Sequence, residues 1–234
     1  MIENIKYWYL RNHKLFEVLN DLEVKDLCII SNYKNAQKDE IIDFSGTDTQ
    51  RLYIVKEGVV KICYQDDEGK EIITEILQDH DIFGCIHFSN TPQKTQRYEY
   101  AKALSKNTSL CSFEINRFKE VLEKNPCLML KYTSFIGEKL ISFQQKYSDI
   151  VFKDVETRLI DFFREYALKH GKERIDGSTE ISMLLTHQEI AEYIASSRQS
   201  VTSAINKLEG EGKILCKSRK VMVIPNLKIF HNVG

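Results

Sequence analysis

The alternation of apolar and polar residues divides the chain into a strand-rich part and a helical part. From residue 40 to about residue 115 the apolar positions approach a period of two, as in RLYIVKEGVVKICY and KEIITEIL. This period is typical of short strands with one buried face. Turns are predicted at Gly46, Gly58, Gly69 and Gly84, and DDEG predicts a tight hairpin because Gly69 can take a positive φ. We therefore expect an all-β unit here.

From Pro126 the apolar period lengthens to three or four residues and continues to Val151, which predicts one long helix. Its apolar positions are Leu128, Tyr132, Phe135, Ile136, Leu140, Phe143, Tyr147 and Ile150. At about 1.5 Å per residue this helix would extend roughly 35 Å, which is longer than packing against one small barrel requires. The surplus apolar stripe predicts contact with the same helix of a twin subunit; burial within its own chain is the alternative.

A further helix is expected from Val155 to His170, ending at Gly171, because glycine commonly follows the last turn of a helix. The next stretch, GKERIDGSTEI, is polar and contains glycine, so we interpret it as a link. After the link, THQEIAEYIASSRQSVTSAINKLEGEG carries the start and stop signals of two short helices.

The first short helix is predicted to begin at a capping box, in which Thr186 and Glu189 each satisfy a backbone N–H group of the other. Its buried side is expected to contain Ile190, Tyr193 and Ile194. A short turn follows at Ala195 and Ser196, and Ser197 can cap the second helix.

The second short helix has two different faces on a helical wheel that begins at Arg198. Its apolar arc contains Val201, Ala204, Ile205 and Leu208. Its polar side contains Gln199, Ser203 and Asn206, flanked by Thr202 and Lys207. Arginine matches guanine, glutamine and asparagine match adenine, and serine or threonine suit either base. The two helices therefore predict a helix-turn-helix that reads DNA; the alternative is a winged-helix domain that contacts protein.

The residues after Gly212, KILCKSRKVMVIP, predict a β-hairpin that would form the wing of such a domain. Its basic turn contains Lys217, Ser218, Arg219 and Lys220. Residues 198–228 contain seven Lys or Arg and two Glu, a local charge of +5, whereas the whole chain has a net charge of −1. Positive charge concentrated beside a reading helix is what phosphate contacts require.

A β-rich unit, a long helix, a helix-turn-helix and a wing, in this order, resemble the CRP/FNR family of bacterial transcription regulators from about residue 12 to residue 228. The resemblance depends on LYIVKEGVVKICYQDDEGKEIITEIL with DIFG, on VFKDVETRLIDFF and on LTHQEIAEYIASSRQSVTSAI. It implies an α+β chain with an effector-sensing double-stranded β-helix, a jelly-roll barrel of the cyclic-nucleotide-binding type with an N-terminal helix. The implied domains are this barrel at residues 1–125, a long dimerisation helix at 126–152 and a winged helix-turn-helix DNA-binding domain at 153–234.

The resemblance further implies a homodimer whose recognition helices enter successive major grooves of a near-palindromic site, with RNA polymerase as a partner. Arg198 matches a base-reading arginine, whereas Gln199 and Ser203 replace a glutamate and an arginine common in the family, so the family's usual half-sites are not expected. The expected DNA contacts are Thr186, His187, Gln188, Ser197, Arg198, Gln199, Ser200, Thr202, Ser203, Asn206, Lys207, Arg219 and Lys220. The expected dimer interface is Leu128, Tyr132, Phe135, Ile136, Leu140, Phe143 and Tyr147.

The expected effector pocket departs from the family's cyclic-nucleotide binders. Those barrels carry FGE and then an Arg-Ser pair that holds the cyclic phosphate, whereas this chain has Cys85 for the glutamate and Tyr98-Glu99 for Arg-Ser. An ionised carboxylate repels phosphate, so the sequence argues against cyclic AMP, although a shifted loop could recruit Arg97. The pocket residues predicted from the resemblance are Phe83, Gly84, Cys85, Arg97, Tyr98, Glu99, Phe143 and Gln144, the last two at the place of polar adenine contacts.

Other effectors stay open at this point. The iron-sulfur members of the family have clustered N-terminal cysteines, and Cys28 alone before the barrel does not replace them, so an iron-sulfur cluster is not expected. Cys85 raises the hypothesis of a thiol sensor; the alternative is a small residue that fills the vacated glutamate site. Haem, a small organic effector or no effector remain as alternatives.

Composition narrows the function classes further. The chain has 234 residues, of which 42% are hydrophobic, enough for two domains without disulfides. Its six cysteines contain no CxxC, so we expect reduced, mostly buried thiols and no metal site. The absence of a signal peptide and of a long apolar run predicts a cytoplasmic protein without a membrane partner. Without HExxH or GxSxG an enzyme is not expected, and a ligand-binding module that acts on a protein partner is the main rival.

Overall fold

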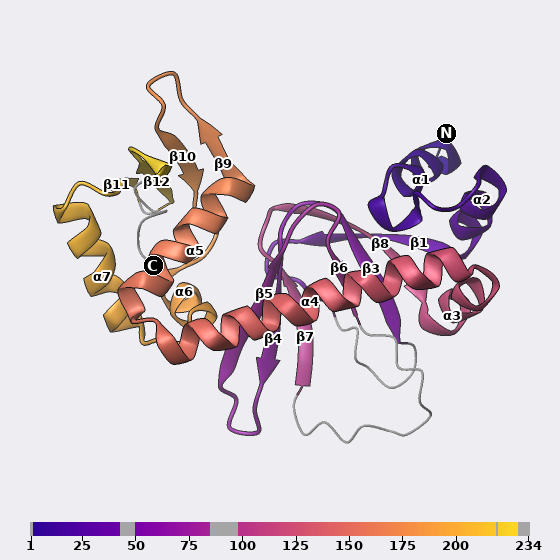
Figure 1. Cartoon of the computed structure of the whole chain (residues 1–234), viewed down its shortest axis with the longest axis horizontal. Helices are drawn as coiled ribbons and strands as arrows, with labels where there is room; N and C mark the ends of the chain where they lie inside the picture. The colour runs from indigo at the N-terminus through magenta and orange to yellow at the C-terminus, as the bar shows by residue number, and fades with distance from the viewer. Residues whose placement is uncertain (1, 43–49, 85–97, 219, 229–234) are drawn as a thin grey trace. The chain divides into compact units, whose positions relative to one another are not determined.

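The computed structural model describes residues 2–42, 50–84, 98–218 and 220–228. The chain divides into two compact units, Met1–Ser142 and Phe143–Gly234, whose elements are labelled in Figure 1. No helix within the described ranges combines the length and the apolar character that a bilayer-spanning segment needs.

The first unit contains eight described strands in two antiparallel sheets. The strands are β1 (Ser31–Gln37), β2 (Ile41–Ile42), β3 (Arg51–Glu57), β4 (Val60–Gln65), β5 (Glu71–Leu77), β6 (Ile82–Phe83), β7 (Tyr98–Ala103) and β8 (Asn107–Glu114). The strand order is β1-β8-β3-β6 in one sheet and β2-β7-β4-β5 in the other. Apolar side chains of both sheets form one core that includes Val55, Val60, Ile62, Phe83, Ala101 and Leu110. The predicted all-β unit is thus present, and it begins earlier than the period of two indicated, at Ser31.

The hairpin predicted at DDEG joins β4 to β5. Gly69 has a φ of +81°, and the Asp66 carboxylate accepts a hydrogen bond from the backbone N–H group of Lys70 at 2.8 Å. Glycine tolerates this left-handed backbone because it has no Cβ atom. The other predicted turn glycines are Gly58 and Gly84, which also have positive φ, and Gly46, which lies outside the described residues.

Helices cover the other face of the β1-β8-β3-β6 sheet. They are α1 (Ile2–Arg11), the 3-10 helix η1 (Lys14–Phe16), α2 (Asp21–Ile30), α3 (Ile115–Lys124) and the first turns of α4 (Pro126–Phe152). Their apolar side chains and those of the sheet form a second core, in which Leu128 and Tyr132 of α4 are 0% and 4% exposed. The expectation that Leu128 and Tyr132 lie in a dimer interface is wrong, because their own unit already covers them.

The second unit combines helices with a third antiparallel sheet. Its elements are α5 (Val155–His170), β9 (Gly171–Glu173), β10 (Thr179–Ser182), α6 (His187–Tyr193), α7 (Arg198–Gly210), β11 (Leu215–Ser218) and β12 (Val221–Ile224). The strand order is β11-β12-β10-β9, so the predicted wing, β11 and β12, pairs with β10. Helices and sheet share buried side chains that include Phe163, Ile181, Ile190, Val201, Leu208 and Ile224.

The stretch GKERIDGSTEI is more than a link, because it forms the hairpin of β9 and β10. Helix α5 ends at His170 as predicted, but Gly171 has a φ of −76°, so a left-handed cap is not the reason for glycine. A Cβ atom there would lie 2.3 Å from the Ala167 carbonyl oxygen and 2.4 Å from Cγ2 of Thr179. Glycine at this position therefore allows the helix and the hairpin to approach closely.

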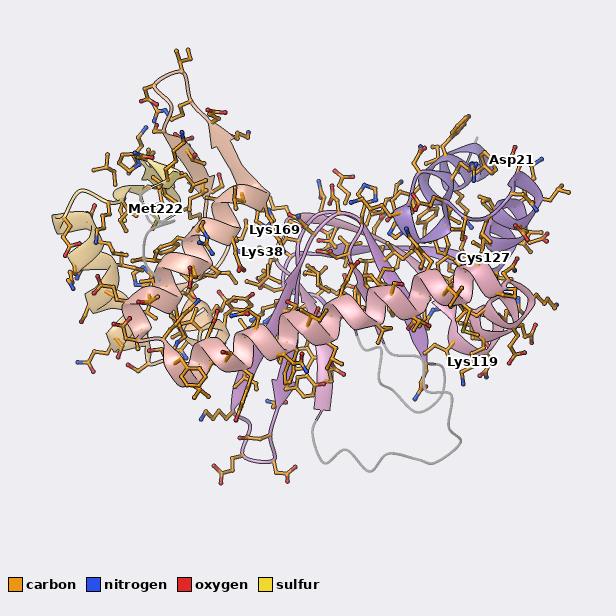
Figure 2. All side chains as sticks on the ribbon, in the orientation of Figure 1. Asp21, Lys38, Lys119, Cys127, Lys169 and Met222 are labelled. Carbon is orange, nitrogen blue, oxygen red and sulfur yellow. The ribbon has the colours of Figure 1, made fainter. Side chains whose placement is uncertain are left out.

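The described cysteines are all free thiols, and their burial differs. Cys63 and Cys111 are buried, Cys28 is half-buried, and Cys127 and Cys216 are exposed. Figure 2 labels Cys127 at the start of α4. The expectation of small buried hydrophobes therefore holds for Cys63 and Cys111 and is wrong for Cys127 and Cys216. Cys85 lies outside the described residues.

Candidate nucleic-acid interface

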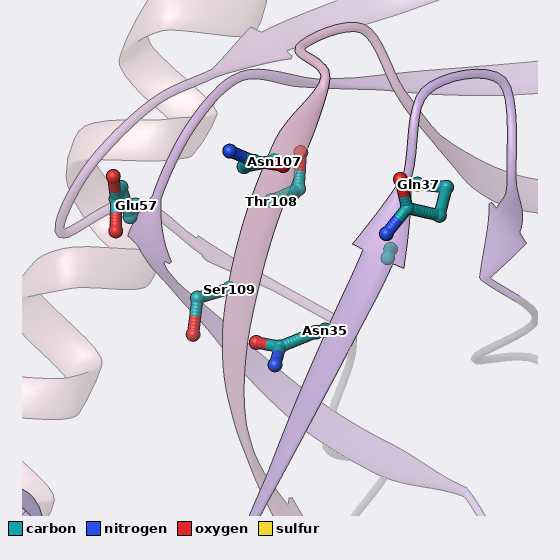
Figure 3. A pocket seen from close by; sticks show the side chains of 7 residues that line it. Asn35, Gln37, Glu57, Asn107, Thr108 and Ser109 are labelled. Atoms are coloured by element: carbon teal, nitrogen blue, oxygen red, sulfur yellow. The ribbon is translucent and has the colours of Figure 1, made fainter.

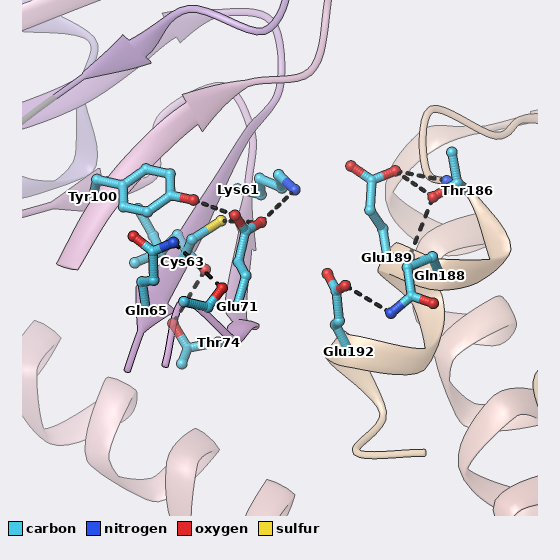
Figure 4. Close-up of polar contacts among 12 residues, drawn as sticks. Lys61, Cys63, Gln65, Glu71, Thr74, Tyr100, Thr186, Gln188, Glu189 and Glu192 are labelled. Carbon is cyan, nitrogen blue, oxygen red and sulfur yellow. Dashed lines mark hydrogen bonds and ion pairs between the residues drawn. The ribbon is translucent and has the colours of Figure 1, made fainter. Parts of the chain in front are cut away.

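Local caps define both helices of the α6–α7 pair. The backbone N–H group of Glu189 donates to the Thr186 hydroxyl at 3.2 Å, and that of Thr186 donates to the Glu189 carboxylate at 2.8 Å (Figure 4). At the start of α7, the Ser197 hydroxyl accepts from the backbone N–H group of Ser200 at 3.0 Å. The predicted capping box and serine cap are confirmed, so both helices start where local sequence dictates.

The turn between α6 and α7 has an unusual backbone conformation at Ala195, whose φ is +54°. Directly after it, the backbone N–H group of Ser196 donates to the Ala191 carbonyl at 2.8 Å and closes the end of α6. A residue with a Cβ atom is destabilised in the left-handed region, where glycine is the usual choice. The turn therefore lies where the sequence predicts it, and it contains backbone strain.

Helix α7 separates an apolar face from a polar one. Val201, Ile205 and Leu208 are 0%, 3% and 0% exposed. The exposed side chains on the polar face are Arg198, Gln199, Ser203 and Asn206. Within the described part of the chain, no hydrogen bond or ion pair engages these four side chains. Their donors and acceptors are thus available to base edges, as the sequence predicts for a reading helix.

Lys207, a predicted DNA contact at the end of this face, already has a partner. Its Nζ donates to Glu156 Oε2 of α5 at 2.6 Å, and this hydrogen bond raises the pKa of Lys207. A surface ion pair of this kind contributes little to stability, because solvent screens it. Because its ammonium group has three donors and its side chain is exposed, Lys207 can still contact a phosphate, although the charge of Glu156 competes for it.

The predicted phosphate contacts on α6 also have neighbours. His187 Nδ1 and Thr202 Oγ1 are 3.1 Å apart, and Thr202 also donates to a carbonyl of its own helix at 2.9 Å. Gln188 donates to the Glu192 carboxylate at 2.9 Å, as Figure 4 shows. The His187–Thr202 contact joins the start of α6 to α7, so these two residues also hold the helix pair together.

The wing carries the rest of the predicted basic surface. Lys217 Nζ lies 3.6 Å from Glu180 Oε2 of β10, which turns this lysine toward its own sheet. Lys220 is exposed, and no ion pair engages it within the described residues. Arg219 lies outside those residues. Of the described wing lysines, Lys220 is therefore better suited to touch a phosphate than Lys217.

The predicted effector residues of the first unit are in different environments. Phe83 is 2% exposed, and its ring stacks on Tyr53 with 4.9 Å between centroids, so it belongs to the core of the first unit. Gly84 has a φ of +89°, and a Cβ atom there would lie 2.4 Å from the Arg51 carbonyl oxygen. Cys85 and Arg97 lie outside the described residues.

Glu99 of β7 lies opposite Tyr64 of β4, while Ile62 pairs with Glu75 of β5. Because paired residues and alternate residues share a sheet face, Tyr64, Glu75 and Glu99 all lie on the face of Ile62. Burial and the nearby charge of Glu75 raise the pKa of Glu99, against a hydrogen bond from Tyr64 and the charge of Lys139. Lys139 of α4 donates to Glu75 at 2.8 Å. This acidic group of side chains suits a phosphate poorly.

The remaining predicted pocket residues do not join this group. Tyr98 is the first residue of β7, whose backbone pairs with Gln65. Phe143 and Gln144 belong to the second unit and are exposed. A pocket shared by these residues and Glu99 stays a prediction. Tyr64, Glu75 and Lys139 were missed, although the strand alternation around Ile62 could have indicated the first two.

A second polar cluster, also missed by sequence reasoning, lies on the opposite face of the β2-β7-β4-β5 sheet (Figure 4). The Lys61 side chain is only 4% exposed, and its Nζ lies 2.9 Å from Glu71 Oε1. Tyr100 donates to the other oxygen of Glu71, and the Cys63 thiol lies 3.3 Å from Oε1. Burial raises the pKa of Glu71, but the hydrogen bonds from Tyr100 and Lys61 outweigh it and hold this pKa below its ordinary value. The buried charge of Lys61 is therefore paired, as its burial requires.

The first unit also has a surface cavity of about 200 Å³ beside β1 and β8 (Figure 3). It is lined by Asn35, Ala36, Gln37, Glu57, Asn107, Thr108 and Ser109. None of the predicted effector residues lines it. Among the described residues, no group of three or more His, Cys, Asp or Glu could hold a metal ion.

Comparisons with known proteins agree with this arrangement. Residues 33–125 match the family model for the cyclic nucleotide-binding domain, and residues 157–230 match that for the Crp-like helix-turn-helix domain. A global nitrogen regulator of Nostoc sp. is 27% identical over 187 residues, which are 80% of this chain and 82% of that protein. An anaerobic regulatory protein of Bacillus subtilis is 25% identical over 186 residues, 79% of this chain and 76% of that protein.

The same fold occurs in a solved structure of a CooA mutant from Carboxydothermus hydrogenoformans. It has a TM-score of 0.72 and 23% sequence identity, and the match covers 95% of this chain and 96% of that chain. One domain match lies in each of the two units. The curated relatives, which are regulators, match this chain over most of their own length. The chain thus belongs to the CRP/FNR family of DNA-binding transcription regulators.

Proposed function

We propose that this regulator acts as a homodimer that reads a near-palindromic DNA site with α7, under the control of an effector received by the first unit. The observation that carries the proposal is the exposed polar face of α7. Arg198, Gln199, Ser203 and Asn206 present donors and acceptors there, opposite the buried Val201 and Leu208. Such a face adds nothing to the core of its own unit and matches the hydrogen-bonding pattern of a major groove.

The side chains of this face favour a particular kind of half-site. Arg198 can bind guanine through two hydrogen bonds, while Gln199 and Asn206 match adenine. Ser203 is short and accepts or donates to either base type. We expect one guanine–cytosine pair beside adenine–thymine pairs in each half-site, which differs from the half-sites usual in the family.

The proposed dimer contact is the part of α4 whose apolar side chains are exposed in the single chain. Its apolar positions Ile136, Leu140, Phe143, Tyr147 and Ile150 follow each other at steps of four and three residues, and they are 39–66% exposed. This spacing is the a/d pattern of a two-stranded coiled coil. We name these five residues the α4 seam. Pairing of two seams would bring two copies of α7 to successive major grooves.

The surroundings of Glu99 restrict the chemistry of an effector that binds beside it. Glu75 and Glu99 would repel a cyclic phosphate, and Lys139, the cation near them, is already bonded to Glu75. We therefore do not assign cyclic AMP. Cys85, the hypothetical thiol sensor, and Arg97 lie outside the described residues.

Partners and location follow from the proposed role. A regulator of this kind acts on chromosomal DNA, so we infer a cytoplasmic location, contact with RNA polymerase and no enzymatic activity. The rival proposal is a ligand-binding module that acts through a protein partner. Salt-sensitive binding to duplex DNA separates the two, because phosphate contacts release counterions.

The test is selection of duplex DNA from a random pool by the purified chain, without ligand and with cyclic AMP. Recovery of a two-fold symmetric site with half-sites about one helical turn apart supports the dimeric reader. Enrichment only with cyclic AMP would overturn the conclusion drawn from Glu75 and Glu99. If neither pool enriches while the chain still binds a protein partner, the rival is favoured.

A further inference from the structure

Arg158, in the first turn of α5, bonds to backbone carbonyls of two different elements. Its Nη1 donates to the carbonyl of Ile150 and to that of Lys153, both at 3.0 Å. Its Nη2 donates to the carbonyl of Ala195 at 3.2 Å. The Ile150 carbonyl lies in the last turn of α4, the Lys153 carbonyl directly follows this helix, and the Ala195 carbonyl lies in the strained turn before α7. All these residues belong to the second unit.

The chemistry of arginine fits this place. The last carbonyls of a helix have no partner within the helix, and a cation near them also interacts favourably with the helix dipole. A planar guanidinium can reach two sides at once, whereas a lysine ammonium is a single point of attachment. The Nε atom of Arg158 is buried without a hydrogen-bond partner among the described residues. Burying an unsatisfied N–H donor costs free energy, so the three hydrogen bonds to carbonyls have to offset this cost.

Further contacts join the same elements. Lys146 Nζ of α4 lies 3.5 Å from the ring centroid of Tyr193 on α6, within the range of a cation–π interaction. The Tyr193 ring in turn packs on Phe162 of α5, with centroids 5.5 Å apart. Helices α4, α5 and α6 are therefore also connected on the α6 side of the turn that Arg158 binds.

We propose that Arg158 is a positioning residue that fixes α7 to the end of α4 and thereby sets the spacing of the half-sites that the dimer accepts. The proposal rests on the proposed function, because it takes the α4 seam as the dimer contact. In such a dimer the two seams lie on the two-fold axis. The distance between the two copies of α7 then depends on how each α7 is held to its own α4. The hydrogen bond from Arg158 to the Ala195 carbonyl connects the end of α4 to the turn that precedes α7.

The experiment compares Arg158→Gln and Arg158→Lys with the control Arg164→Gln. Arg164 lies on the same helix and pairs with Asp161 at 3.3 Å, three residues before it in the chain. Affinity is measured for the selected symmetric site and for the same site with one base pair inserted or removed at its centre. Circular dichroism and thermal melting of the full chain monitor folding.

We expect the wild type and Arg164→Gln to prefer the selected spacing by about tenfold or more. Arg158→Gln should bind the selected site about tenfold more weakly and lose most of this preference, because α7 is no longer fixed to α4. Arg158→Lys should melt close to the wild type, since it keeps the cation at the end of α4, but it should also lose the spacing preference.

The outcomes separate this inference from the proposed function. If the wild type binds no symmetric site, the proposed function is wrong and the inference falls with it. If the wild type discriminates between spacings and both Arg158 variants keep the same ratio, Arg158 does not position α7, even where overall affinity drops. Should Arg158→Gln fail to fold, the spacing ratio of Arg158→Lys decides alone.

Discussion

Arg198 and Lys220 are both exposed cations of the second unit, but they are expected to meet DNA in different ways. Arg198 lies at the start of α7, where it can bond a guanine, so Arg198→Ala should cost about 1–3 kcal/mol on the cognate site and relax preference at one base pair. Lys220 lies in the wing turn, and Lys220→Ala should weaken binding to all sequences alike. Titrations with cognate and random duplexes measure both effects. Equal losses on both duplexes for both variants would refute these roles.

The left-handed conformation of Ala195 gives a prediction on stability. With a φ of +54°, its Cβ atom destabilises the turn, and Ala195→Gly should raise the free energy of unfolding by on the order of 1 kcal/mol. Urea denaturation of the full chain measures the change. Ala204→Gly, in the interior of α7, is the matched control and should be destabilising by a similar amount. A loss of stability in Ala195→Gly as well would contradict the strain at this turn.

Residue roles were predictable where the interacting groups are close in the sequence. The Thr186–Glu189 capping box and the Ser197 cap join residues three positions apart, so their spacing alone indicates the bond. The contacts of Lys207 with Glu156 and of Arg158 with Ala195 span 51 and 37 positions. Nothing local encodes such contacts, because the folded arrangement of α5 against the helix pair creates them.

At the scale of elements, the α4 seam predicts how the chain associates. Phe143 and Tyr147 are 66% and 65% exposed, and paired seams would remove this apolar surface from water. Phe143→Glu and Tyr147→Glu should each convert a dimer into a monomer, because a charge buried in the seam lacks a partner. Light scattering measures the mass, and circular dichroism checks that α4 persists.

The control for the seam is Leu130→Glu. Leu130 is 70% exposed on the same helix but lies outside the spacing of four and three residues, so its variant should remain dimeric. Phe135, in contrast, is half-buried against the core of the first unit. A charged residue at this position would therefore affect folding more than association. Dimers in both seam variants would move the interface to another part of the chain.

His13 connects η1 to the turn between β5 and β6, and it gives a pH dependence. Its Nδ1 accepts from the backbone N–H group of Leu15 at 3.2 Å, so its Nε2 carries the proton and donates to the His80 carbonyl at 2.9 Å. Burial lowers the pKa of His13 to about 4 from an ordinary 6.5. Between these values the unfolded chain binds more protons than the folded one, so stability falls as the pH falls from 6.5 towards 4.

The full effect of His13 would amount to about 3 kcal/mol by linkage. His13→Gln keeps an N–H donor for His80 and cannot titrate, so its stability should depend less on pH across this window. Urea midpoints at several pH values measure the difference. Other groups titrate in this range as well, so the contribution of His13 is the difference between the pH profiles of the wild type and of His13→Gln. Parallel pH profiles of the two proteins would show that His13 is not the group responsible.

Elements with a strong apolar period were predictable, and short polar ones were not. Helices α4, α5 and α7 and strands β3 to β5 follow clear periods, and the predicted starts of α4, α5 and α7 agree with the structure. The strands β9 and β10 were missed because Gly171–Glu173 and Thr179–Ser182 are mostly polar and too short for a period. They become strands because β12 offers a neighbour for β10, which is a tertiary effect.

At the scale of the whole molecule, charge is distributed unevenly. The chain has a net charge of −1, and residues 198–228 contribute +5, so the other residues sum to −6. A protein with this total has no general attraction for a polyanion. Binding to DNA must therefore depend on the basic segment and on its orientation toward the phosphates.

This distribution predicts a steep dependence on salt. If a dimer makes 6–10 phosphate contacts, its affinity for DNA should fall by about 10³-fold or more between roughly 50 and 200 mM salt. Lys220→Ala should reduce the slope of log affinity against log salt by about 2 for a dimer, one contact per subunit. Mass measured by light scattering over the same range is the control, because an apolar α4 seam does not weaken with salt. An affinity that stays constant while the dimer persists would mean that the segment from Arg198 to Lys228 does not face phosphates.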